Sequence, residues 1–102
     1  MQWRTGDAMG RVTVMAIPGL DLWFNSSDHL PPHFHARKPG EWEIRVYIMD
    51  CSEGHLEFDM KWPPRGGGPR SREKNRILEA TLRNRVDLVR EWASKVLIAE
   101  NR

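Results

Sequence analysis

The chain has 102 residues and a formal net charge of +2, and 39% of its residues are hydrophobic. This length suits one domain with one core, and no run of about 20 apolar residues predicts a membrane span. Residues 1–10 lack the apolar stretch of a secretory signal, and the single cysteine, Cys51, excludes an internal disulfide, so we expect a cytoplasmic protein.

The first part of the chain is predicted to hold an arm and two short strands. Residues 1–10 contain two glycines and show no hydrophobic period, which predicts a flexible arm. Residues 11–17 and 20–24 alternate in hydrophobicity, so each is predicted to form a strand. Pro31 and Pro32 have no amide hydrogen, so their stretch is extended and lies outside the centre of a sheet.

The clearest strand pattern follows these prolines. A strand is predicted to begin over residues 33–37, and residues 41–50 alternate over their whole length. A short strand is predicted over 55–59, and the Pro- and Gly-rich connector 61–70 is predicted to have no regular structure. In the 41–50 strand, one face carries Trp42, Ile44, Val46 and Ile48, and the other carries Glu41, Glu43, Arg45 and Tyr47.

The last part of the chain is predicted to be helical. From Ser71, the expected N-cap, apolar residues recur with a period of about 3.6. Two helices are predicted, over 72–83 and 85–99, because Asn84 interrupts the apolar stripe and imitates a helix start. One long helix is the alternative, since no Gly or Pro separates the two.

These elements predict an α+β fold in a single domain over residues 11–102. A small antiparallel sheet of four to five strands would occupy residues 11–60. Two carboxy-terminal helices, within residues 71–100, would pack on one face of that sheet.

Three of the four histidines, His29, His33 and His35, gather around the two prolines. A strand projects residues i and i+2 to the same face, so His33 and His35 are expected to point together. Such a pair can bind zinc or another divalent metal if a third ligand is supplied from elsewhere. The alternatives are structural histidines held by packing and hydrogen bonds, or a binding or catalytic role without metal. The candidates for the third ligand are Asp28, His29, His55 and Glu57.

A family resemblance rests on this same region. Trp23-Phe24-Asn25-Ser26-Ser27-Asp28-His29, followed by Pro31-Pro32-His33-Phe34-His35, resembles the bacterial family catalogued as domain of unknown function 4160. Asn75-Arg76-Ile77, Leu88 and Trp92 are similar in spacing to its two-helix tail, so the resemblance covers residues 11–96. Two features depart from the family: the connector at 63–69 is longer, and Asn84 stands where members often have histidine. The resemblance implies no established activity, and it implies a protein partner of the kind found in toxin–antitoxin pairs.

The charges are distributed unevenly along the chain. Acidic residues outnumber basic ones up to residue 60, and the reverse holds from residue 61 onward. This asymmetry predicts either a basic face for an acidic partner or two halves that attract each other. Basic side chains at helical spacing can meet nucleic-acid phosphates, although neighbouring acidic residues can also pair with them. The candidate nucleic-acid residues are Arg70, Arg72, Arg76 and Arg83.

Our first interpretation is a non-enzymatic protein-binding module whose partner is a cognate small protein or a second copy. The alternatives are a histidine-centred metal-binding protein or enzyme, and nucleic-acid binding through the basic helices. No motif of nucleophilic or nucleotide-driven chemistry is present, which leans against an enzyme, and a divalent metal is the one cofactor considered. Burial of both imidazoles would favour a scaffold role, whereas an open pocket converging on them would favour chemistry. The candidate binding residues are Asp28, His29, Pro32, His33, His35 and Arg37.

Overall fold

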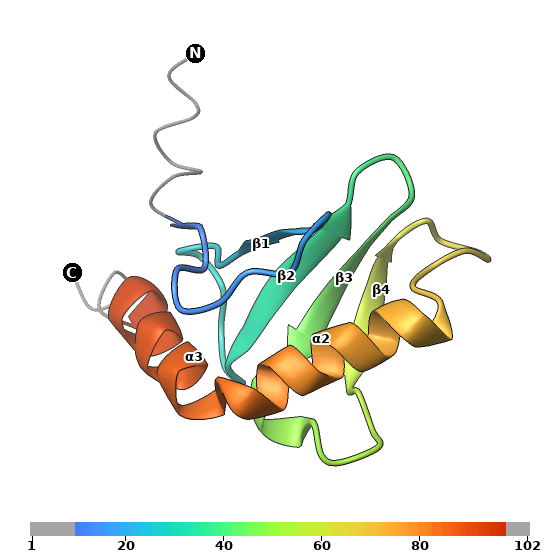
Figure 1. Cartoon of the computed structure of the whole chain (residues 1–102). Coiled ribbons are helices and arrows are strands. Elements are labelled where there is room, and N and C mark those ends of the chain that lie inside the picture. Colours follow the sequence, from blue (N-terminus) through green and yellow to red (C-terminus); the bar gives the residue numbers. More distant parts are fainter. Residues whose placement is uncertain (1–9, 98–102) are drawn as a thin grey trace.

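A computed structural model describes residues 10–97 and has four strands followed by two α-helices (Figure 1). The predicted arm over residues 1–10 therefore lies almost wholly outside the described residues. Within residues 10–97, no helix has the length and apolar character needed to cross a membrane. The elements are β1 (Asp21–Trp23), β2 (His33–Lys38), β3 (Trp42–Tyr47), the 3₁₀ turn η1 (Ile48–Asp50), β4 (Phe58–Trp62), α2 (Ser71–Arg83), α3 (Arg85–Trp92) and the π-helical turn η2 (Ala93–Leu97).

The four strands form one antiparallel sheet in the order β1-β2-β3-β4. In the central pair, His33 lies opposite Tyr47 and His35 lies opposite Arg45. The ladder between β3 and β4 is irregular between Glu43 and Ile44, where the register shifts by one residue and leaves Lys61 of β4 unpaired. The predicted α+β fold, an antiparallel sheet followed by two helices, is confirmed.

The two faces of the sheet have different roles. Phe34 and Ala36 of β2 and Ile44 and Val46 of β3 are completely buried, and α2 and α3 lie along that side (Figure 1). Side chains alternate along a strand, so the residues between these point to the opposite face. That opposite face carries the histidines. The helices contribute Ile77, Leu78, Leu88 and Trp92 to the same core.

The predicted strand over residues 11–17 is absent from the structure. Arg11 forms a single bridge to Trp23, and the chain then leaves the sheet. The amide of Thr13 donates instead to both oxygens of the Glu91 carboxylate on α3, at 3.0 and 2.9 Å. The prediction was wrong because a carboxylate far along the sequence takes the donor that a neighbouring strand would have used.

Glu91 holds this amino-terminal segment against α3. Its carboxylate also accepts from the Val14 amide at 3.2 Å, from the Thr13 hydroxyl at 2.9 Å and from the Lys95 ammonium group. Burial raises the pKa of Glu91, but the hydrogen bonds from Lys95 and Thr13 outweigh burial, so the pKa lies below its ordinary value. Glu91 is therefore ionised at neutral pH.

Two strand boundaries differ from the prediction. The chain turns at Ile48–Asp50 instead of continuing the strand that was predicted to reach residue 50. The last strand spans Phe58–Trp62 and not the predicted 55–59, so the first two residues of the predicted 61–70 connector belong to the sheet. Trp62 pairs with Glu43, and the strand ends where prolines remove the next amide donors.

The carboxy-terminal part has two helices that meet at Asn84, as predicted. The amide and the side-chain nitrogen of Asn84 both donate to the Ala80 carbonyl, at 3.1 and 2.8 Å, which ends the first helix. Ser71 is the first helical residue and not the N-cap, because the Arg70 amide outside the helix donates to Glu73 at 2.9 Å. The second helix ends at Trp92, and residues 98 and 99 of the predicted span lie outside the described residues.

Candidate metal centre

Strand β2 brings two imidazoles to the same side of the sheet. His33 and His35 are two residues apart, and their ring centroids are 5.4 Å from each other. Only 6% and 3% of these residues is exposed, because the loop between β1 and β2 folds over them. The sequence-based expectation that the two rings point together agrees with this geometry.

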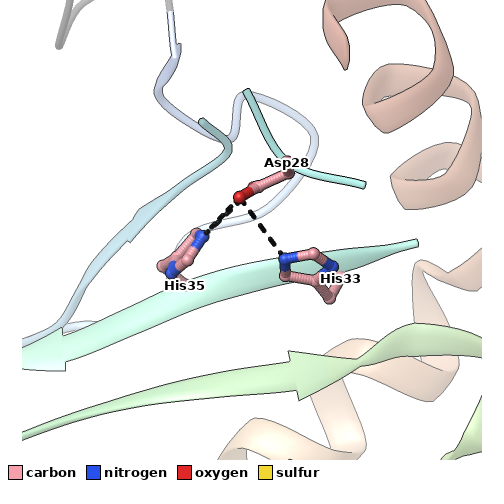
Figure 2. A group of neighbouring side chains, drawn as sticks. All are labelled: Asp28, His33 and His35. Atoms are coloured by element: carbon pink, nitrogen blue, oxygen red, sulfur yellow. Dashed lines mark hydrogen bonds and ion pairs between the residues drawn. The ribbon is translucent and has the colours of Figure 1, made fainter. Parts of the chain in front are cut away.

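The loop after β1 supplies a carboxylate to both rings (Figure 2). Asp28 lies 3.5 Å from Nε2 of His33 through Oδ1 and 3.1 Å from Nε2 of His35 through Oδ2. The Asn25 amide donates to Oδ2 at 3.0 Å, and the Asp28 amide donates to the Asn25 carbonyl at 2.9 Å, so a tight turn fixes the carboxylate. Within residues 10–97, Asp28, His33 and His35 form a group whose ligand atoms all lie within 4.8 Å of one another.

Of the four candidates for a third ligand, the structure brings Asp28 to the pair. His55 and Glu57 instead contact each other at 2.7 Å on the exposed surface. His29 lines the cavity beside the cluster without belonging to it. The three clustered residues are called the Asp-His-His cluster below.

The hydrogen bond of His33 to the backbone determines where its ring proton sits. Nδ1 of His33 lies 2.8 Å from the Pro31 carbonyl oxygen. A carbonyl can only accept, so Nδ1 carries the hydrogen and Nε2 of the neutral ring carries a lone pair. That lone pair faces the Asp28 carboxylate, which is also an acceptor. Two acceptors that face each other need a proton or a cation between them.

His35 is held by an aromatic contact as well as by Asp28. Its ring stacks on Trp23 of β1, with centroids 5.3 Å apart and an angle of 16° between the planes. Burial lowers the pKa of His35 and outweighs the opposing attraction of the Asp28 carboxylate, so the ring is neutral near neutral pH. Its Nδ1 is buried and has no hydrogen-bond partner. A neutral imidazole is the form that binds a metal ion.

The cluster opens into a cavity of about 290 Å³. This cavity is also lined by Arg45 and Tyr47 of β3 and by Lys61 of β4. The Tyr47 hydroxyl donates to Asp59 at 2.6 Å, and burial followed by this hydrogen bond raises the pKa of Tyr47. By the criteria set from the sequence, the burial of both imidazoles favours a structural role, and the open pocket that they line favours chemistry.

Sequence reasoning did not single out these three lining residues. The alternation over residues 41–50 already placed Arg45 and Tyr47 on the polar face, and the strand register could have put them next to the histidines. Lys61 was assigned to a connector without regular structure. Its position at the cavity could not be predicted without knowing that β4 extends to Trp62.

Two predicted binding residues lie outside the lining of the cavity. Arg37 lies over the Trp23 ring, 5.2 Å from its centroid, and pairs with Asp21 at 3.0 Å on the surface. Pro32 offers its carbonyl to the Ile48 amide at 3.2 Å, so it supports the fold next to the site.

The predicted nucleic-acid residues are exposed but do not meet the cavity. They lie at the start of and along α2, and Arg76 donates to the Pro18 carbonyl at 3.0 Å. Nucleic-acid binding stays a prediction for this helix face. Its four candidates, all exposed, are Arg70, Arg72, Arg76 and Arg83.

The fold and the site define a class by geometry: a four-stranded antiparallel sheet with two helices on one face and an Asp-His-His cluster on the other. Comparison with protein-family models, with curated proteins and with solved structures found no match for the chain. The resemblance to domain of unknown function 4160 therefore stays a prediction.

Proposed function

We propose that this protein binds a divalent metal ion of the zinc class through Asp28, His33 and His35. The observation that carries this proposal is the position of Nε2 of His33, which faces the Asp28 carboxylate at 3.5 Å while Nδ1 of the same ring lies 2.8 Å from the Pro31 carbonyl oxygen. Ligands about 2.0–2.2 Å from a tetrahedral zinc ion lie roughly 3.4 Å from one another. Through the single oxygen Oδ1, the Asp28 carboxylate lies 3.5 Å from Nε2 of His33 and 3.3 Å from Nε2 of His35, and both distances are close to that value.

The surroundings of the cluster also favour a metal ion. A histidine that binds a metal through one ring nitrogen commonly donates the N–H of the other ring nitrogen to a carbonyl or carboxylate, as His33 does to Pro31. Two imidazoles and one carboxylate are a ligand set that suits zinc and neighbouring divalent ions. Three protein ligands would leave one coordination position open, as in catalytic zinc sites, and the cavity lies beside the cluster.

Equilibrium dialysis against zinc, followed by metal analysis of the protein, tests this proposal. Wild type should retain one zinc per chain. Asp28→Asn and His33→Asn should weaken binding by more than the roughly 10- to 100-fold expected for an outer-shell partner. His55→Asn is the matched control, because His55 is exposed and pairs with Glu57 away from the cluster. Equal zinc retention in all four proteins would overturn the proposal.

A second candidate function is protein binding in which the partner is a second copy of the chain, held at the open edge of the sheet. β4 forms one edge, and its Met60 and Trp62 are 39% and 49% exposed. Antiparallel pairing of two β4 strands about Met60 would set Asp59 of one copy opposite Lys61 of the other, and opposite charges favour such pairs. Sedimentation should then show a dimer that Lys61→Glu weakens. A monomer at every concentration would end this proposal.

A further inference from the structure

The cavity beside the Asp-His-His cluster contains more positive than negative side chains. Arg45 and Lys61 are basic side chains of the lining, and Asp28 is the carboxylate among the lining residues. Two further acidic residues lie next to Arg45: Glu43 is two residues before it on β3, and Asp59 of β4 is its cross-strand partner. Neither of them lines the cavity. A divalent ion on the cluster would increase this positive excess.

Arg45 is the residue that points most directly to a ligand. Its Nε is buried and has no hydrogen-bond partner. Guanidinium groups form their strongest hydrogen bonds with carboxylate or phosphate oxygens. Arg45 lines the cavity beside Lys61 and the cluster, so its guanidinium group is placed to meet an anion there.

We propose that a phosphate-type oxyanion binds in this cavity, with one oxygen on the metal ion and others on Arg45 and Lys61. This inference rests on the proposed metal-binding function. The three cationic groups come from the cluster, from β3 and from β4, so they approach the cavity from separate elements. A tetrahedral oxyanion has enough oxygens to meet all three, whereas a carboxylate has only two.

The size of the cavity limits the ligand. Pockets for drug-sized ligands span about 300–1,000 Å³, and this cavity of about 290 Å³ lies at the lower end. It suits inorganic phosphate or a small phosphorylated molecule whose remaining part projects outward. It is too small to enclose a dinucleotide.

Cobalt(II)-loaded protein allows metal binding and phosphate binding to be measured together, because the visible absorption of bound cobalt reports its ligands. Inorganic phosphate is titrated into wild type, Arg45→Met, Lys61→Met and the control Arg37→Met. Arg37 lies on the same face of the sheet but outside the cavity lining, so its loss removes the same charge without removing a proposed contact. Acetate is titrated in parallel as the carboxylate arm.

Phosphate should change the cobalt spectrum of wild type and Arg37→Met at the same concentration, and acetate should need a higher one. Arg45→Met should keep its affinity for cobalt while its affinity for phosphate falls roughly 10- to 100-fold, the cost of one charge-assisted hydrogen bond. Lys61→Met should show a smaller fall. Unchanged phosphate affinity in Arg45→Met overturns the inference, as does cobalt binding without any phosphate response. Absence of cobalt and zinc binding in wild type would instead remove the proposed function itself.

Discussion

Zinc should raise the thermal stability of this protein, and the size of the increase can be estimated. The Asp-His-His cluster is assembled by the β1–β2 loop and β2, so the unfolded chain holds its three ligands less favourably. A ligand present at 100 times its Kd, and binding only the folded state, stabilises that state by about 2.7 kcal/mol. For a domain of about 100 residues each kcal/mol raises Tm by roughly 4–8 °C, so the expected increase is roughly 10–20 °C.

The assay is differential scanning fluorimetry with zinc or with a chelator, and each variant is compared with its own metal-free state. His55→Asn should show the full increase, since His55 lies on the surface away from the cluster. Asp28→Asn and His35→Asn should show little or none, even where their metal-free Tm is already lower. An equal increase in His35→Asn and wild type would refute the reasoning, because zinc would then be acting at another place.

Three further changes test the fold that positions the site. Glu91→Gln should lower the free energy of unfolding by ~1–3 kcal/mol at pH 7, while Glu79→Gln on the exposed face of α2 should not. Because the pKa of Glu91 is lowered in the folded state, the stabilisation by its carboxylate is complete above the ordinary carboxyl pKa and disappears as the pH falls through the lowered value. Urea titrations in which the difference between wild type and Glu91→Gln stays constant down to low pH would contradict this. Ile44→Ala, in the completely buried core, should cost about 2–5 kcal/mol in the same titration, and a cost below that of an exposed substitution would be inconsistent with the packing. Gly10→Ala should lower Tm because its Cβ would lie 2.5 Å from the Phe24 carbonyl oxygen, and an unchanged Tm would show that the segment can shift.

Much of the fold follows from local sequence patterns. The alternation from Trp42 to Val46 predicts β3, and the interrupted stripe at Asn84 predicts two helices. The strand predicted over 11–17 also alternates, but it does not form because Glu91 takes the Thr13 amide. Such a contact joins residues 78 positions apart and leaves no local trace in the sequence.

The candidate site was predictable only in part, for a similar reason. The spacing of His33 and His35 alone places both rings on one face, because strand geometry fixes that relation. Choosing Asp28 among four possible third ligands requires the shape of the turn at Asn25, which composition does not determine. Placing Arg45 at the cavity requires the pairing of β2 with β3. Sequence patterns thus predict the strand, and tertiary structure decides which side chains meet across it.

The most direct test of the metal centre is a crystal structure of the zinc-loaded protein with anomalous diffraction data collected at the zinc edge. We expect one strong peak about 2.0–2.2 Å from an Asp28 oxygen and from Nε2 of both His33 and His35, with the fourth position facing the cavity. A map with no peak at these three side chains, from crystals grown in excess zinc, would contradict the account.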